Sequence, residues 1–114
     1  MKKVEAIIRP TKIRDVLAAL KEVGVTGINV IATKGQGRGE RFPVRSSMGV
    51  VLYTAEYNAL CTIITVVDDH LLNAVISSIT TAAGTGNKGD GKIFISTIDD
   101  VVDINTKRSG LHAL

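Results

Sequence analysis

An α+β domain built from two successive β-α-β units is the fold class that the sequence predicts. Apolar residues alternate in four short segments and recur at helical spacing in two others, and the order strand–helix–strand occurs twice. A long glycine-rich segment separates the two halves. With 114 residues, the chain is expected to form a single domain over residues 1–114.

The first half begins with a strand over residues 3–9, which Pro10 ends because proline cannot donate a hydrogen bond to a sheet. Thr11 is the predicted N-cap of an amphipathic helix. Gly24 stands at the end of this helix, where glycine readily adopts the left-handed conformation. A second strand is predicted over residues 27–33.

From residue 34 to about residue 57 the regular pattern stops, and glycine, proline and serine interrupt the chain. Segments of this length without regular structure are uncommon inside compact domains and are usually functional or disordered. We expect one long exposed loop, or a hairpin with a mobile tip. The tail, residues 99–114, shows only weak apolar alternation.

The second half repeats the order of the first. A strand is predicted over residues 58–67, and Asp68 and Asp69 are the predicted caps of the helix that follows. A glycine-rich loop over residues 84–92 then leads into a last strand that ends at Thr97.

These elements predict a four-stranded antiparallel sheet with both helices on one face, the ferredoxin-like fold. The other face is expected to carry Ile7, Ile31 and Ile64, with no helix available to cover them. Because an exposed apolar face is unfavourable in water, we expect copies of the chain to bury it by self-association.

Composition argues against several functions. Aromatic residues make up 4% of the chain and the net charge is +3, which offers few stacking platforms and no basic stripe for nucleic acid. Cys61 is the single cysteine, so an internal disulfide is impossible and a reducing compartment fits. The charged start of the chain is unlike a signal peptide, and no apolar run approaches the roughly 20 residues of a membrane helix. We expect a cytoplasmic protein that binds no nucleic acid.

The strongest functional signal is the run from Thr85 to Lys92, T-G-N-K-G-D-G-K. Closely spaced glycines let backbone N–H groups converge on an anion, and Lys88 and Lys92 add positive charge. The run is not a P-loop, because Ile93 stands where Ser or Thr is required and the helix precedes the loop. A plain glycine-rich turn is the alternative, but three glycines with two lysines favour phosphate binding.

A second basic, glycine-rich run covers residues 34–41, K-G-Q-G-R-G-E-R. No helix follows it, so it is not a dinucleotide fingerprint. Three interpretations stay open: a flexible phosphate clamp through Arg38, a very short nucleic-acid segment, and a mobile loop entry without a binding role.

No arrangement of residues supports catalysis or a metal site. Cys61, His70 and His112 are scattered along the chain. Asp68 and Asp69 fit helix caps better than a catalytic pair. No Ser/His/Asp or Cys/His arrangement is present, so we expect a protein that is not an enzyme.

The tail carries charges of both signs. The acidic residues Asp99, Asp100 and Asp103 are expected to be solvated. Lys107 and Arg108 are either solvated as well or reach an anion across a subunit boundary.

Three segments together resemble the PII signal-transduction family: residues 1–10 (M-K-K-V-E-A-I-I-R-P), residues 34–39 (K-G-Q-G-R-G) and above all residues 85–94 (T-G-N-K-G-D-G-K-I-F). The last segment is similar to the nucleotide-binding signature of that family. The likeness runs over residues 1–38 and 66–97 and is weak in the long loop and the tail.

The resemblance implies a ferredoxin-like homotrimer that binds ATP or ADP, with or without Mg²⁺, in clefts between subunits. It implies regulation through the long loop, called the T-loop (about residues 36–57), which docks on a transporter, a channel or a metabolic enzyme. Contact with a membrane would then come only through a transporter partner. Carried over by position, the phosphate contacts of the family fall on Gly89, Asp90, Gly91 and Lys92, and the residues that close the cleft fall on Gly37 and Arg38. The contacts to the base and the sugar fall on Ile7, Asn29, Ile64 and Val66. Lys107 and Arg108 are candidate phosphate contacts from the tail.

Four positions depart from the family pattern. The family glutamine that ligates Mg²⁺ falls on Gly39, and the lysine that pairs with 2-oxoglutarate falls on Leu60. The two tail arginines that hold phosphates fall on Asp103 and Asn105. The resemblance therefore implies a branch that keeps the nucleotide site and lacks the usual 2-oxoglutarate site.

The leading hypothesis is an adenine-nucleotide-binding regulator that senses energy or metabolic state, within nitrogen metabolism. The alternative is a PII-like sensor of another small molecule, such as bicarbonate or AMP. An enzyme on the same fold and a nucleic-acid binder rank below both. The uridylylated tyrosine of the family falls on Tyr53 by spacing and on Tyr57 by local sequence. By spacing, Tyr53 is the candidate modification site.

Overall fold

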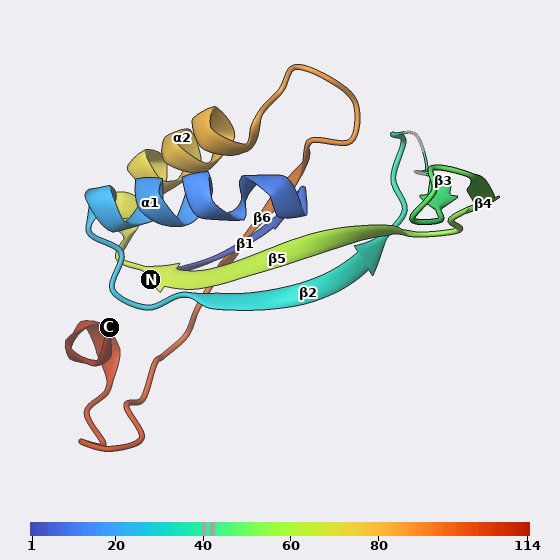
Figure 1. Ribbon diagram of the computed structural model, residues 1–114. Coiled ribbons are helices and arrows are strands. Elements are labelled where there is room, and N and C mark those ends of the chain that lie inside the picture. The colour runs from blue at the N-terminus through green and yellow to red at the C-terminus, as the bar shows by residue number, and fades with distance from the viewer. Residues whose placement is uncertain (40, 42) are drawn as a thin grey trace.

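The computed structural model contains one four-stranded sheet, two helices and a projecting hairpin (Figure 1). It describes residues 1–39, 41 and 43–114. The strands and helices are β1 (Lys2–Ile8), α1 (Ile13–Val23), β2 (Asn29–Gly35), β3 (Pro43–Arg45), β4 (Val51–Thr54), β5 (Asn58–Val67), α2 (Leu72–Ala83) and β6 (Gly91–Thr97). Short 3₁₀ turns lie at η1 (Pro10–Lys12), η2 (Asp69–Leu71) and η3 (Gly110–Ala113).

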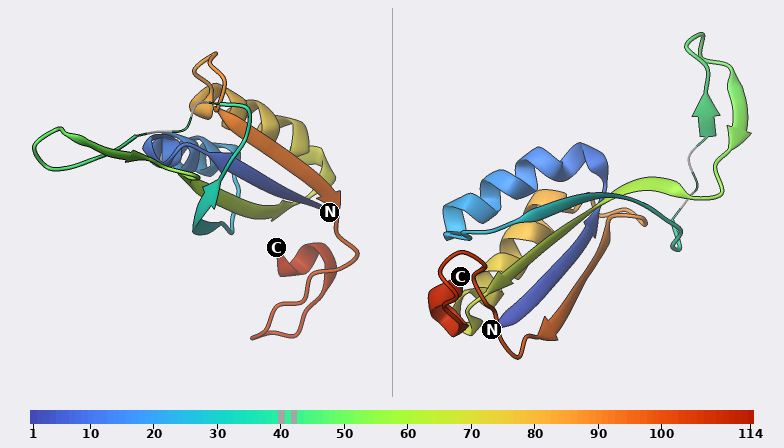
Figure 2. Two further views of the ribbon diagram at one scale, coloured as in Figure 1. Left: turned by 90° about the vertical axis from the view of Figure 1, so that its right-hand side faces the viewer. Right: turned by 90° about the horizontal axis from the view of Figure 1, so that it is seen from below.

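The sheet has the order β2-β5-β1-β6, and all neighbouring strands are antiparallel. Both helices lie on the same face of the sheet (Figures 1 and 2). In this register Ile8, at the end of β1, pairs with Cys61 on one side and Gly91 on the other. The predicted ferredoxin-like fold is confirmed.

The core lies between the helices and the sheet and is aliphatic. Every second residue of β1 points into it, as the alternation in the sequence predicts, and α1 and α2 contribute residues at helical spacing. Its buried apolar members are Val4, Ala6, Ile8, Val16, Leu20, Cys61, Ile63, Val67, Val75, Ile79 and Ala83. None of the helices in the described part of the chain is long and apolar enough to cross a membrane.

The other face of the sheet carries apolar side chains that the helices do not cover. Ile31 is 44% exposed and Phe94 is 52% exposed, while Ile7 and Ile64 are half-buried. Ile7 lies opposite Thr62, whose hydroxyl lies 3.2 Å from that of Thr33 on β2. The predicted placement of Ile7, Ile31 and Ile64 on this face follows from the observed register.

The long segment between the halves is partly regular. Strands β3 and β4 form a hairpin that projects away from the sheet (Figure 2). Its turn is closed by hydrogen bonds from the Ser46 amide to the Val50 carbonyl (2.8 Å) and from the Gly49 amide to the Ser46 carbonyl (3.0 Å). Gly49 has φ +81°, which only glycine adopts without cost.

The predicted helix caps require correction. Thr11 lies inside the 3₁₀ turn η1, which Pro10 starts and for which Arg9 is the N-cap, while the N-cap of α1 itself is Lys12. Asp68 takes the N-cap position of η2, but its side chain caps no backbone amide among the described residues. The Asp68 and Asp69 carboxylates instead lie 3.0 Å from His70 Nδ1 and 3.0 Å from the terminal amine of Met1, respectively. Gly24 does end α1 in the left-handed conformation, with φ +98°, as predicted.

The tail also differs from expectation, because two of its aspartates organise turns rather than being simply solvated. Asp103 accepts hydrogen bonds from the amides of Thr106 (2.8 Å) and Asn105 (2.9 Å), and the Thr106 amide, the Thr106 side chain and the Asn105 amide lower its pKa. Asp100 accepts from the amides of Val101 (2.8 Å) and Gly110 (2.9 Å). Together these bonds fold the tail back on itself as a hairpin-like loop.

Candidate functional site

A cleft of about 640 Å³ lies where the base of the T-loop meets the glycine loop, residues 84–92. Apolar side chains from three strands form part of its wall: Ile7, Leu60 and Phe94. Cationic side chains lie on both loops and on the strands that lead to them: Lys34, Arg38, Lys88 and Lys92. None of the described residues that line the cleft carries a carboxylate. Such a cleft suits a ligand with an apolar part and an anionic part.

The glycine loop is organised around the Asp90 carboxylate. Its Oδ2 atom accepts hydrogen bonds from the amides of Thr85 (2.7 Å) and Gly86 (3.0 Å), and its Oδ1 atom accepts from the Thr85 hydroxyl. Arg9 Nε lies 3.4 Å from Oδ1. The Thr85 hydroxyl and amide, the Gly86 amide and Arg9 together lower the pKa of Asp90 to about 2. The carboxylate is therefore ionised at neutral pH and fixes the path of the loop.

Gly91 permits the close approach of this loop to β1. It has φ +115°, and a Cβ atom built on it would lie 1.7 Å from the carbonyl oxygen of Ile7. No side chain fits there. The next residue, Lys92, pairs with Ile7 in the sheet and lines the cleft.

The structure brings together most of the residues predicted for phosphate contact and cleft closure. The predicted residues that line the cleft are Ile7, Gly37, Arg38, Gly89, Gly91 and Lys92. Asp90 lies in the same loop, but its carboxylate is bonded within the loop and does not line the cleft. A second opening of about 540 Å³ adjoins the first and shares Arg38, Leu60 and Lys88 with it.

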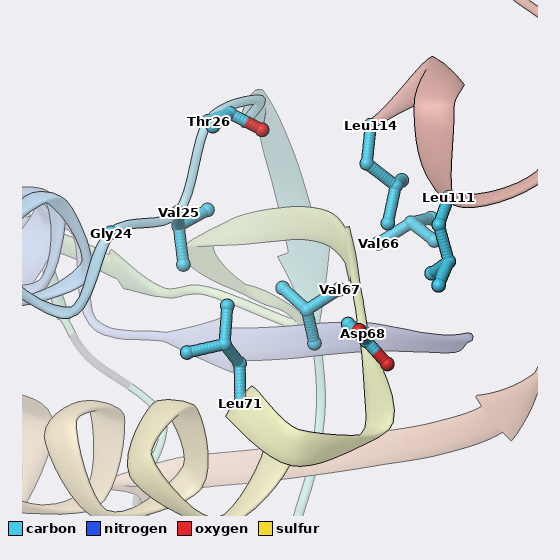
Figure 3. Close-up of a pocket in the computed structure, with 9 residues that line it drawn as sticks. All are labelled: Gly24, Val25, Thr26, Val66, Val67, Asp68, Leu71, Leu111 and Leu114. Atoms are coloured by element: carbon cyan, nitrogen blue, oxygen red, sulfur yellow. The ribbon is translucent and has the colours of Figure 1, made fainter.

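The remaining predicted residues lie elsewhere in the same chain. Asn29 pairs with Ile64. Val66 is six residues beyond Leu60 on β5, about 20 Å along an extended strand. Val66 lines a small cavity of about 160 Å³ with Leu111 and Leu114 of the tail, which lie beside it in Figure 3.

The tail residues Lys107 and Arg108 and the candidate modification site Tyr53 also lie outside the cleft. Lys107 has φ +62°, an uncommon conformation for a residue with a side chain. Tyr53 lies on β4 of the hairpin and is 60% exposed.

Sequence reasoning missed several residues that line the cleft. Phe94 lies two residues after Lys92 on β6, so the period of a strand places both on one face and could have identified it. Thr33 and Thr62 are brought in by the cross-strand register of β2 and β5, which the sequence alone does not specify. In the described ranges, no group of three or more His, Cys, Asp or Glu side chains is placed to hold a metal ion.

The fold and the site define a small ferredoxin-like protein with a projecting hairpin and a basic cleft at the hairpin base. The family model described as nitrogen regulatory protein P-II matches residues 1–108. Relatives of that name are 42% identical in Bradyrhizobium diazoefficiens, 42% in a Synechocystis species and 40% in Azospirillum brasilense, each aligned over the full length of both chains.

The chain belongs to the nitrogen regulatory protein P-II family. Members of this family are signalling regulators that act on partner proteins, and they are not enzymes. The resemblance drawn from residues 1–10, 34–39 and 85–94 is thereby confirmed, and the enzyme alternative is set aside.

Proposed function

We propose that the chain is an adenine-nucleotide-binding regulator that senses energy or metabolic state and controls a partner protein through its T-loop. ATP or ADP binds in the cleft between the glycine loop and the T-loop base. The observation that carries the proposal is the composition of this cleft, with apolar residues on strands and four cationic side chains around a glycine loop whose shape Asp90 fixes. The choice of adenine rests on the likeness of residues 85–94 to the nucleotide signature of the family.

The phosphates lie against the glycine loop in this proposal. Gly89 and Gly91 line the cleft, and Lys92 on β6 and Arg38 at the T-loop base supply positive charge to it. Mg²⁺ is not needed to hold the ligand, because these cations already offset phosphate charge. Asp90 supports binding indirectly, by holding the loop.

In this proposal, the predicted residues Asn29, Ile64 and Val66 contact the nucleotide from a neighbouring copy of the chain. Val66 lies about 20 Å beyond Leu60 on β5, too far along the strand to reach a nucleotide bound at the glycine loop of the same chain, and neither Asn29 nor Ile64 lines the cleft. A homotrimer that buries the uncovered sheet face would bring this set, and the tail with Lys107 and Arg108, to the cleft of the next subunit.

The hairpin suits contact with a partner protein in the cytoplasm. Four apolar or aromatic side chains that are half or more exposed follow one another at its turn and on β4: Val50, Val51, Leu52 and Tyr53. Exposed apolar patches of this kind mark interaction sites. A transporter, a channel or a metabolic enzyme is the proposed partner, and Tyr53 is accessible for modification.

Two measurements test the proposal. Light scattering at micromolar concentration should give about three times the chain mass of 12.1 kDa. Calorimetry with ATP, ADP, AMP and bicarbonate should show binding of ATP and ADP, and Lys92→Ala should weaken it by about ten-fold or more, since a charge-assisted contact contributes roughly 1.5–3 kcal/mol. An unchanged affinity in Lys92→Ala, or binding of bicarbonate alone, would reject the site.

A further inference from the structure

Two glycines from segments far apart in the sequence touch at the edge of the cleft. A Cβ atom built on Gly39, at the base of the T-loop, would lie 2.8 Å from the Cα atom of Gly89 and 3.1 Å from its amide nitrogen. Both neighbouring atoms belong to the backbone, which cannot rotate away as a side chain can. The T-loop therefore reaches the glycine loop at this point only because residue 39 has no side chain.

Arg9 also holds the glycine loop. Its Nη2 atom donates a hydrogen bond of 3.0 Å to the Lys88 carbonyl, and its Nε atom lies 3.4 Å from the Asp90 carboxylate. The same Nη2 atom lies 3.2 Å from the position of a Cβ atom on Gly89. Gly89 is thus in close contact with both the T-loop base and the guanidinium of Arg9, which directly follows β1.

The contact is particular to Gly39 and is not a general property of the T-loop base. A Cβ atom built on Gly37, two residues earlier, would have no atom within 4 Å. Gly89 itself has φ +91°, so it is confined to glycine by conformation as well as by space.

We infer that Gly39 is a positioning residue that couples the T-loop to the glycine loop through direct backbone contact, without a metal ion. A change in the shape of the glycine loop displaces Gly89 and therefore the T-loop base, and by thermodynamic reciprocity a partner that moves the T-loop alters the glycine loop. The coupling is intrinsic to the chain. Its use as a signal rests on the proposed function, because the ligand that changes the glycine loop is the proposed nucleotide.

Hydrogen–deuterium exchange on the ligand-free protein tests the contact. Gly39→Ala should raise amide exchange about ten-fold or more in both residues 36–57 and residues 84–91, because exchange follows the free energy of local opening. Gly27→Ala is the matched control, since a Cβ atom there has open space and ordinary backbone. A rise in only one of the two loops, or none, would overturn the inference.

A double-mutant comparison separates coupling from simple loosening. Thr85→Ala removes a hydrogen bond to Asp90 and should loosen the glycine loop. It should also raise exchange in the T-loop when Gly39 is present, and it should add nothing there in the Gly39→Ala background. Equal effects in both backgrounds would show that the two loops are independent.

A third experiment repeats the exchange measurement with ADP in the presence of EDTA, at ADP concentrations that saturate each variant. ADP should change T-loop exchange in the wild type and not in Gly39→Ala. A wild-type response that persists in Gly39→Ala would refute the coupling route. If ADP does not bind the wild type at all, the proposed function fails, while the ligand-free comparison still decides the role of Gly39.

Discussion

The Asp90 carboxylate accepts hydrogen bonds from both the backbone amide and the hydroxyl of Thr85, five residues earlier in the chain. This pair of bonds closes the glycine loop into a ring, and Lys88, Gly89, Gly91 and Lys92 line the cleft. The charge of Asp90 is therefore used to shape a site for anions, although Asp90 itself is an anion.

Replacing Asp90 should change how stability depends on pH. The folded-state pKa of Asp90 is about 2, below the usual value of about 3.9 for an unfolded chain. A depressed pKa contributes stability above the unfolded value, and this contribution is lost as pH falls from about 4 to about 2. Asp90→Asn should unfold at a lower temperature than the wild type at pH 7, and the difference should shrink across that window. Thermal unfolding at a series of pH values checks this, and parallel profiles for the two proteins would contradict it.

Replacing Gly91 should disrupt the fold. A Cβ atom at this position would lie 1.7 Å from the Ile7 carbonyl oxygen, and φ is +115°. Gly91→Ala should lose about 3 kcal/mol or more of unfolding free energy, or fail to fold. Urea denaturation measures the loss, with Gly27→Ala as the control that should stay within about 1 kcal/mol of the wild type. Similar stability in the two variants would show that β6 does not approach β1 this closely.

ADP should bind at least as well as ATP. The γ-phosphate needs matched positive donors to offset its desolvation, and Asp103 and Asn105 supply none. Calorimetry with wild type and with the Lys107→Ala/Arg108→Ala double variant decides the point. A wild type that prefers ATP by about ten-fold or more, with the preference lost in the double variant, would show that the tail clamps the triphosphate.

Lys107→Gly is the matched control for that experiment. This substitution removes the charge of the side chain and also removes the steric cost of the left-handed backbone at residue 107, where φ is +62°. If the charge of Lys107 matters, Lys107→Ala and Lys107→Gly should change the ATP affinity equally. A difference between them would assign the effect to the backbone of the tail.

2-Oxoglutarate should bind weakly or not at all, even with Mg-ATP present. Its two carboxylates need matched cations or a metal bridge, whereas Leu60 is apolar and Gly39 has no side chain to hold a metal. Titration checks this, and Leu60→Lys should increase any affinity. Micromolar binding by the wild type would contradict the prediction.

The sequence predicted the fold because the local signals agree with one another. The alternation in β1 and the helical spacing in α1 and α2 each identify the face that the core buries. The sequence left open whether the segment between the two halves is a long loop or a hairpin, because the strands Pro43–Arg45 and Val51–Thr54 are short and weakly patterned. Thr11 was misplaced because Pro10 starts a 3₁₀ turn before the helix.

The site was predictable where residue type alone limits the backbone, and less so where distant segments meet. Glycines and lysines at residues 86–92 identified the loop, but the partners of Asp90 could not be read from the sequence, because Arg9 is 81 positions away. The contact between Gly39 and Gly89 depends likewise on the path of two loops. Asp103 was expected to be solvated, since an aspartate that bonds the amides two and three residues later has no distinct sequence signal.

The single thiol of the chain is sealed inside the core, at Cys61 on β5. Burial raises its pKa, so little thiolate forms at neutral pH, and oxidants and alkylating reagents react with the thiolate. The Cys61 thiol should therefore escape oxidation and alkylation while the protein stays folded. Alkylation of Cys61 therefore requires that β5 has opened to solvent, so the extent of alkylation reports on unfolding of the chain.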